Sequence, residues 1–428
     1  MREKEALIMV DKLQDKYNGD IFFINRNEFS YILNKNMIIS NEKNQSEQLA
    51  LRITDDRGVG YAVASGEYDI DKIVENAILT LKYNNEKLNL EDAPMCENSS
   101  KVQIYDETIE KLDFRTIELW RRKLTLLVPQ ALKFQCSISG NIDEIWYYRF
   151  VKKNYVRSNS YKKTCIKVIF ILYDEKGETL VYYRNGKDRL FDFIDEIQKK
   201  VRNPIVLYPI KTYSKKITDV ILSPLGVYCV LKNYIGMFCN GKIAPKKMDN
   251  IKFDKGLSIW DKGDIDWQIG SQPFDDEGVE CRETVLIQDG QFLNYYTDIL
   301  SSHTYGKKTT GNARRSWCVP PSPIMNNVII DSSKKSDDLF EKLNYGLYVD
   351  YIEDIGISDN INGIFCGTVI VGYIVYNGKI IGKLKKCKIY INIDKALTDV
   401  LTGYKKEWIS GDFYTPEILI KNIKIEEI

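Results

Sequence analysis

Two dipeptides in the second half of the chain constrain its fold more than any other feature. Asp289-Gly290 stands between the runs ETVLIQ and QFLNYY, and Asn377-Gly378 stands between YIVY and KIIGKL. Asp-Gly and Asn-Gly suit the positive φ angles of a two-residue β-hairpin turn. We therefore predict antiparallel strand pairs on both sides of these turns.

The first half of the chain mixes helical and strand patterns. After Asp69, apolar residues recur at helical spacing, and Asp69 itself suits the N-cap of that helix. The runs LALRITDD and VGYAVAS predict a hairpin around residues 56–58, and CIKVIFILY and TLVYYR predict a strand pair that turns at residues 174–177. A further helical region is predicted over residues 107–132, interrupted by Pro129.

The length of 428 residues predicts two domains. Near Thr218 the pattern changes from mixed helices and strands to strands and hairpins. We therefore predict an α+β chain, with a mixed α/β N-terminal domain over residues 1–215 and an antiparallel, sheet-rich C-terminal domain over residues 216–428.

Charge and cysteine usage exclude some partners and indicate a compartment. The 61 basic and 60 acidic residues give a net charge of +1, so no overall field attracts nucleic acid or a membrane surface. The apolar runs, residues 168–173 among them, are far too short to cross a bilayer, and the N-terminal run is too short for a signal peptide. Nine cysteines occur singly, without a CxxC pair. This cysteine usage predicts reduced thiols in a cytoplasmic protein. The neutral charge and the short apolar runs predict that it has no nucleic-acid or membrane partner.

The stretch SQPFDDEGVE places three acidic residues, Asp275, Asp276 and Glu277, before Gly278. Neighbouring carboxylates in an extended chain point to opposite faces, so the three do not line one cation cage. The ligand spacing of an EF-hand is also missing, and a carboxylate pair for glycosidase-type catalysis would need partners from separate elements. We favour a turn in which the acidic side chains accept hydrogen bonds from backbone N–H groups and Gly278 supplies the turn conformation.

The segment KKTTGNARR, residues 307–315, combines a turn with two arginines. Arg314 and Arg315 could bind a carboxylate or a phosphate, because guanidinium forks match such anions. Alternatively, these arginines pair with the acidic residues 275–277 and hold two loops together. The pattern fits both interpretations.

His303 is the only histidine in the chain. The thiols also lack metal-ligand spacing, so no conventional zinc site is predicted. A nucleophilic Cys–His pair would require His303 to meet Cys366 or another thiol in space. We favour an ordinary polar role for His303, and we predict Cys229 and Cys239 as small buried apolar residues.

Four stretches, taken together, resemble the TldD/PmbA family, formerly called modulators of DNA gyrase. They are RGVGYAVASGEYDIDKIVENAI, SQPFDDEGVECRETVLIQDGQFL, TTGNARR and NGIFCGTVIVGYIVYNGKI. Their order and spacing agree with the family over nearly the whole chain. The resemblance implies a barrel-like C-terminal domain. It also implies a peptide-processing role for a complex in which a TldD-type subunit carries an HExxxH zinc helix and a TldE-type subunit does not.

The helix that matches the family's zinc helix is VLKNYIGMFCNGK. By resemblance, Lys232 and Met237 stand where the two histidines would be, and Asn233 stands where the glutamate would be. A lysine cation repels a dication, methionine is a soft ligand, and asparagine cannot act as a general base. The resemblance is therefore to the PmbA/TldE-like branch, which lacks the zinc motif.

The resemblance implies a non-catalytic subunit, with no catalytic residue, metal or cofactor in this chain and with zinc in a TldD-like partner. Unfolded or leader-bearing peptides would be the substrate, as in ribosomal peptide maturation, and an extended peptide would add to an edge of the C-terminal sheet. A self-sufficient thiol-dependent peptidase and a homodimeric peptide-binding module stay open as alternatives. The candidate peptide-binding or structural residues are Asp275, Asp276, Glu277, Gly278, Thr310, Gly311, Asn312, Arg314 and Arg315.

Overall fold

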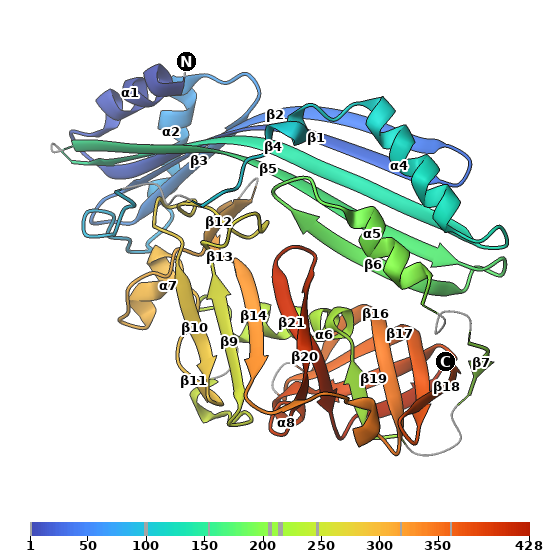
Figure 1. Cartoon of the computed structure of the whole chain (residues 1–428). Coiled ribbons are helices and arrows are strands. Elements are labelled where there is room, and N and C mark those ends of the chain that lie inside the picture. The colour runs from blue at the N-terminus through green and yellow to red at the C-terminus, as the bar shows by residue number, and fades with distance from the viewer. Residues whose placement is uncertain are drawn as a thin grey trace.

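Two large sheets and the helices that cover them form the α+β framework of the molecule (Figure 1). The structure, a computed structural model, describes residues 2–97, 102–152, 155–203, 208–212, 217–244, 248–316, 319–359 and 362–428. The domain boundary predicted between residues 215 and 216 lies outside the described residues. Among those that are described, no helix has both the length and the apolar character that a membrane crossing requires.

The first sheet has six strands in the order β3-β2-β1-β4-β5-β6, and every neighbouring pair in it is antiparallel. Its central strands are long: β1 and β2 contain 17 residues each, and β4 and β5 contain 19 each. The predicted hairpins are confirmed by the pairing of β2 with β3 and of β5 with β6. The strands are β1 (Asn18–Asn34), β2 (Ile38–Thr54), β3 (Val59–Ser65), β4 (Lys133–Val151), β5 (Tyr155–Tyr173) and β6 (Thr179–Lys187).

Helices bury one face of this sheet. One apolar cluster joins α1 and α2 to one half of that face, and a second joins α4 and α5 to the other half. Asp69 caps α2 as predicted, by accepting a hydrogen bond from the backbone N–H of Asp71. The helical region expected before Pro129 is two helices, α3 and α4. The helices of this half are α1 (Arg2–Leu13), α2 (Ile70–Leu81), α3 (Glu107–Glu110), α4 (Phe114–Leu127) and α5 (Phe193–Val201).

The second sheet is mixed. Its main strand order is β11-β10-β9-β14-β21-β8-β16-β17-β18-β7, and β15, β20, β19 and β22 branch from it. Most pairs are antiparallel, whereas β14 with β21, β15 with β20, β16 with β8 and β18 with β7 are parallel. A hairpin turn predicts the pairing of two strands that are adjacent in the chain. The parallel pairs join strands that are far apart in the chain, so no short sequence motif predicts them.

The strands of this half include a separate hairpin, β12 with β13. The bounds of β7 to β14 are β7 (Ile210–Lys211), β8 (Val220–Leu222), β9 (Leu257–Lys262), β10 (Glu283–Gln288), β11 (Gln291–Phe292), β12 (Ala313–Ser316), β13 (Val319–Pro323) and β14 (Asn327–Ser332). Those of β15 to β22 are β15 (Lys335–Ser336), β16 (Tyr345–Asp359), β17 (Ile364–Tyr376), β18 (Lys379–Leu384), β19 (Cys387–Asn392), β20 (Leu401–Ile409), β21 (Phe413–Ile420) and β22 (Lys424–Glu427).

Both predicted hairpin turns are confirmed. Asp289 and Gly290 have φ angles of 50° and 76° and join β10 to β11, and Asn377 and Gly378 have φ angles of 46° and 74° and join β17 to β18. The two ends of the main strand order, β7 and β11, contain only two residues each. They offer little backbone on which an extended peptide could add as a further strand.

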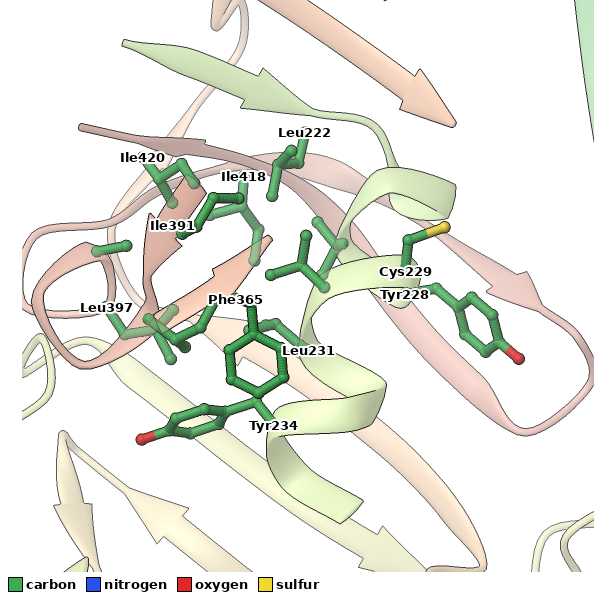
Figure 2. Packing of buried hydrophobic residues seen from close by; sticks show 14 of the residues in the cluster. Leu222, Tyr228, Cys229, Leu231, Tyr234, Phe365, Ile391, Leu397, Ile418 and Ile420 are labelled. Carbon is green, nitrogen blue, oxygen red and sulfur yellow. The ribbon is translucent and has the colours of Figure 1, made fainter. Parts of the chain in front are cut away.

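Helix α6 (Pro224–Phe238) lies at the centre of the second half and packs against β16 and β21. The Ser223 side chain caps it by accepting a hydrogen bond from the backbone N–H of Gly226, and Pro224 opens the first turn. Figure 2 shows Leu231 and Tyr234 turned toward Ile391 and Leu397, while Tyr228 and Cys229 point to the other side of the helix. The second half also contains α7 (Ile299–Thr304), α8 (Ile393–Ala396) and two short 3₁₀ helices, Met248–Asn250 and Phe340–Lys342.

Candidate functional site

The acidic segment 275–277 forms a tight, buried turn, as predicted. One carboxylate oxygen of Asp275 accepts hydrogen bonds from the backbone N–H groups of Glu277 and Val279, both at 2.9 Å. Its other oxygen accepts from the backbone N–H of Ala313, also at 2.9 Å. Gly278 has a φ angle of +74°, which glycine adopts at little cost. Asp275 therefore holds its own turn and ties it to β12.

Gly278 is required for a second reason. A Cβ atom at this position would overlap the ring of Tyr147, which projects from β4 of the first sheet. The turn therefore lies directly against the first sheet, and its close approach depends on the missing side chain.

Glu277 joins the two halves of the chain through Arg52 of β2. One carboxylate oxygen of Glu277 accepts a hydrogen bond from Arg52 at 2.6 Å, and the other accepts from the backbone N–H of Ile299 at 2.7 Å. Arg52 also donates to Asp20 of β1. The side chains of Arg52, Glu277 and Asp20 are 2%, 1% and 0% exposed. A buried charge network therefore joins the first sheet, the acidic turn and α7.

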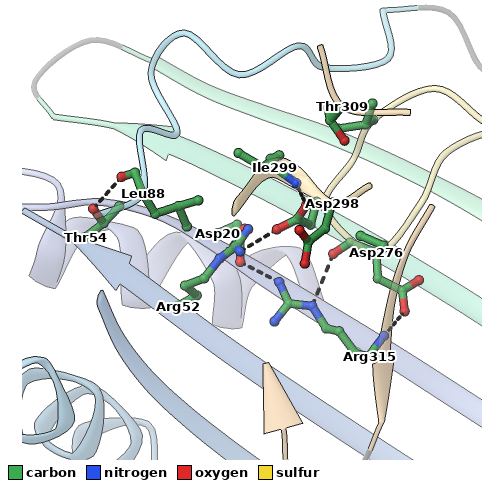
Figure 3. A network of polar contacts seen from close by, with 12 residues as sticks. Asp20, Arg52, Thr54, Leu88, Asp276, Asp298, Ile299, Thr309 and Arg315 are labelled. Carbon is green, nitrogen blue, oxygen red and sulfur yellow. Dashed lines mark hydrogen bonds and ion pairs between the residues drawn. The ribbon is translucent and has the colours of Figure 1, made fainter. Parts of the chain in front are cut away.

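Arg315 enters the same network from β12, and Figure 3 shows it close to Asp20 and Asp276. Its guanidinium donates to Asp20 at 2.7 Å and to the backbone carbonyl of Asp276 at 3.1 Å. The Asp276 carboxylate accepts from the backbone N–H of Arg315 at 2.6 Å. Burial by itself raises the pKa of Asp20, but the nearby Arg52 and Arg315 guanidinium groups bring that pKa below its usual value.

The expected pairing of the two arginines with residues 275–277 needs a correction. The ionic partner of Arg315 is Asp20, and that of Glu277 is Arg52. Arg314 instead hydrogen-bonds the side-chain oxygen of Asn326 and forms no ion pair with any described residue. The loops are held together as expected, but by backbone contacts and by charges from the first sheet that lie far away in the sequence.

Thr310, Gly311 and Asn312 act as a scaffold for β12. The Thr310 hydroxyl accepts from the backbone N–H of Thr297 at 2.7 Å. The Asn312 amide donates to Asp261 at 2.6 Å. A Cβ atom on Gly311, whose φ angle is +75°, would overlap the carbonyl oxygen of Glu280. Burial raises the pKa of Asp261 to about 7.

The structure adds buried charged residues that sequence patterns did not identify. Besides Asp20, Arg52 and Asp261, Arg149 of β4 donates to the backbone carbonyls of Glu277 and Ala93 at 2.5 and 2.7 Å. Arg52 and Arg149 could have been identified from the sequence, because each is a charged residue inside an apolar strand run, LALRIT and WYYRFV. Such a charge is rarely buried unless it is paired.

A cleft of about 450 Å³ lies between the face of the first sheet that no helix covers and the two motif loops, which carry SQPFDDEGVE (residues 271–280) and KKTTGNARR (residues 307–315). Its sheet wall includes Phe22 of β1 and Tyr161 of β5, and its loop wall includes Gln272, Asp276 and the segment 314–316. The Tyr161 hydroxyl donates to the Gln272 side chain at 3.1 Å. Asp276 and Arg315 of the buried network thus line one wall of a cavity large enough to hold part of a ligand.

The three positions that match the zinc motif lie on α6. The Lys232 ammonium group donates to the Asp412 carboxylate at 2.8 Å and to the Tyr228 hydroxyl at 3.0 Å. Burial lowers the pKa of Lys232, but Asp412 and Tyr228 raise it above its usual value, so the side chain is a cation at neutral pH. Asn233 is exposed and Met237 is half-buried. An ammonium, an amide and a thioether do not fit a catalytic zinc ion.

His303 and Cys366, the named candidates for a thiol site, lie far apart. His303 is exposed on α7, whereas Cys366 lies on β17 opposite Tyr390 of β19, on the other side of the second half in Figure 1. Cys229 and Cys239 are buried as predicted, and burial raises their pKa to about 11 and about 12. Within the described ranges, no group of three or more His, Cys, Asp or Glu side chains is arranged to hold a metal ion.

The fold and site define a class: an α+β protein of two sheets, in which two motif loops form a buried charge network against the first sheet. The family model described as the PmbA/TldA metallopeptidase C-terminal domain matches residues 214–427. The chain belongs to the TldD/PmbA family.

Individual relatives agree with this assignment. An uncharacterised protein of Methanocaldococcus jannaschii is 26% identical over 88% of this chain and 89% of its own length. A zinc metalloprotease TldD homologue of Saccharolobus solfataricus is 25% identical over 86% of this chain and 83% of its own length. The crystal structure of TldE from Thermococcus kodakarensis superposes over the full length of both chains with a TM-score of 0.79 at 15% identity, which shows a common fold.

Proposed function

We propose that this chain is a non-catalytic, TldE/PmbA-like subunit of a TldD-type zinc metallopeptidase complex in the cytoplasm, which processes unfolded or leader-bearing peptides. The observation that carries the proposal is the ion pair between Lys232 and Asp412. It puts a cation on the helix face where, by resemblance, a catalytic subunit would hold its metal ligands.

Two further observations support a role beside a catalytic partner. His303 is the single histidine of the chain and is exposed on α7, away from α6. Two residues of the family motifs, Glu277 and Arg315, are used inside this chain, in a buried network with Arg52 and Asp20. A rigid wall of this kind suits a subunit that completes a chamber and positions a peptide for a partner's zinc.

Reconstitution with a TldD-like partner that has an intact HExxxH motif tests the proposal. An unfolded peptide is incubated with this chain alone, with the partner alone and with the mixture, and cleavage is followed by mass spectrometry. We expect cleavage only in the mixture. Full activity of the partner by itself, or cleavage by this chain alone, contradicts the proposal.

One variant separates the thiol-dependent alternative from the proposal. His303→Ala removes the only imidazole, so it abolishes activity if a thiol–histidine pair acts, and leaves the activity of the mixture unchanged if the partner's zinc acts. A stable complex with the partner, measured by light scattering, also separates the proposal from the alternative of a homodimeric peptide-binding module.

A further inference from the structure

We propose that the cleft between the first sheet and the motif loops binds an acidic side chain of the peptide substrate. This inference rests on the proposed function, because it assigns to the chain the contact that positions the peptide. It places the contact in the cleft rather than at the short edge strands of the second sheet.

The charge of the cleft points to an anionic ligand. Its lining has five basic side chains against two acidic ones: Arg26, Lys163, Lys167, Arg314 and Arg315 against Asp143 and Asp276. The chain as a whole has a net charge of only +1. Positive charge is therefore concentrated at this cavity.

Part of this charge is compensated within the protein. Arg26 pairs with Asp143 at 2.7 Å, and Arg315 pairs with Asp20 at 2.7 Å. These two arginines line the cleft, but their charges are largely neutralised by these carboxylates and contribute little to ligand binding.

Arg314 and Lys167 form no ion pair with a described carboxylate, and only longer-range attraction reaches them, from Asp276 and Asp275 to Arg314 and from Asp188 to Lys167. The Arg314 guanidinium donates only to neutral oxygens, those of Asn326, Ala313 and Gly270. Lys167 projects from β5 into the cleft, is exposed, and forms no ion pair within the described part of the chain. An incoming carboxylate would give these two cations a direct ion-pair partner.

Lys163 adds to the same field. Its ammonium group donates to the backbone carbonyls of Ile269 and Ser271 at 2.7 and 2.6 Å, and its carboxylate partner, Asp188, lies at 3.3 Å. Burial raises the pKa of Asp188 to about 8, so this partner is largely uncharged at neutral pH. Lys163 therefore also contributes uncompensated positive charge.

The remaining lining suits a peptide. Phe22, Ile24 and Ile145 present apolar side chains along the sheet wall, and Gln48 and Tyr161 present polar groups between them. The volume of about 450 Å³ lies within the roughly 300–1,000 Å³ of typical ligand sites. A low-dielectric wall strengthens the attraction between a carboxylate and the cationic groups.

Two fluorescein-labelled peptides of equal length with amidated C-termini, GEGEGEG-amide and GQGQGQG-amide, test the proposal by fluorescence anisotropy on the full chain alone. We expect the glutamate peptide to bind about tenfold more tightly, with an affinity that falls as salt increases. Lys167→Glu should weaken the binding of the glutamate peptide by roughly fivefold or more and leave the glutamine peptide unaffected. Lys176→Glu is the matched control, because Lys176 is an exposed lysine on the turn between β5 and β6, outside the cleft.

Equal affinities for the two peptides, or an unchanged affinity in Lys167→Glu, would overturn the proposal. Displacement of the glutamate peptide by inorganic phosphate at an equal concentration would also overturn it, in favour of a phosphate site. Since the partner is absent from this experiment, a negative result here leaves the reconstitution result standing, and the two proposals fail separately.

Discussion

Arg52 and Glu277 form an ion pair of 2.6 Å between almost fully buried side chains that are 225 residues apart in the sequence. Removing one partner leaves the other charged and unpaired in the interior. We expect Arg52→Met to lower the free energy of unfolding by about 3–5 kcal/mol in urea denaturation. Lys405→Met is the control: it breaks the exposed pair with Glu407 and should change the free energy of unfolding by only about 0–1 kcal/mol. Similar losses in both variants would contradict the assigned role of the network.

Gly278 and Gly177 form a matched pair for testing the approach of the acidic turn to the first sheet. Both have positive φ angles, 74° and 85°, but only a Cβ atom on Gly278 meets another group, the Tyr147 ring. We expect Gly177→Ala to lower stability by about 1–2 kcal/mol through backbone strain alone. Gly278→Ala should lower it clearly more, because the turn must also move away from β4. Equal melting temperatures for the two variants would show that this contact is unimportant.

Asp188 should make stability dependent on pH. Its pKa is raised to about 8 by burial, whereas the unfolded value is about 3.9. The folded chain therefore binds more protons between about pH 4 and pH 8, and stability falls as the pH rises through this window. In Asp188→Asn, stability should decrease less as the pH rises. Near pH 8 this variant should be more stable than the parent chain. Glu175→Gln, on an exposed turn, is the control. Parallel stability curves for parent and Asp188→Asn would rule out this assignment.

Zinc content tests the interpretation of α6. We expect the purified chain to hold no stoichiometric zinc and to keep its melting temperature in the presence of a chelator. Lys232→Met removes the cation that pairs with Asp412, whose second oxygen already has no hydrogen-bond partner among the described residues, so stability should fall by roughly 1–3 kcal/mol. Metal analysis that finds about one tightly held zinc per chain would contradict the interpretation.

Local patterns predicted local structure well. The N-cap at Asp69, the turns at residues 289–290 and 377–378, and the acidic turn at residues 275–277 each depend on neighbours within a few positions. In each case the side chain or φ angle that defines the structure belongs to the motif itself. These features could therefore be predicted from short stretches of sequence.

The partners of the buried charges could not be predicted in the same way. Pairing of Arg314 and Arg315 with the acidic turn was one of the two interpretations that the sequence allowed, because the charges of the turn are opposite and close in sequence. The structure instead brings Asp20 and Arg52 to the same point from the first sheet. Ion pairing depends on which strands pack together, and a single sequence gives no direct signal for a contact between residues 20 and 315. The four parallel strand pairs escaped prediction for the same reason.

The pair of Asp20 and Arg315 has a consequence for biosynthesis. Asp20 belongs to β1 and leaves the ribosome 295 residues before Arg315, a delay of about 15–60 s at roughly 5–20 residues per second. During that interval Arg52, which follows after only 32 residues, is the partner already available to Asp20. The Asp20 carboxylate in the nascent first sheet can therefore pair with Arg52 early. The uncovered face of that sheet stays exposed until the motif loops have been synthesised. Chaperones that protect nascent chains should have their longest opportunity to bind at that face.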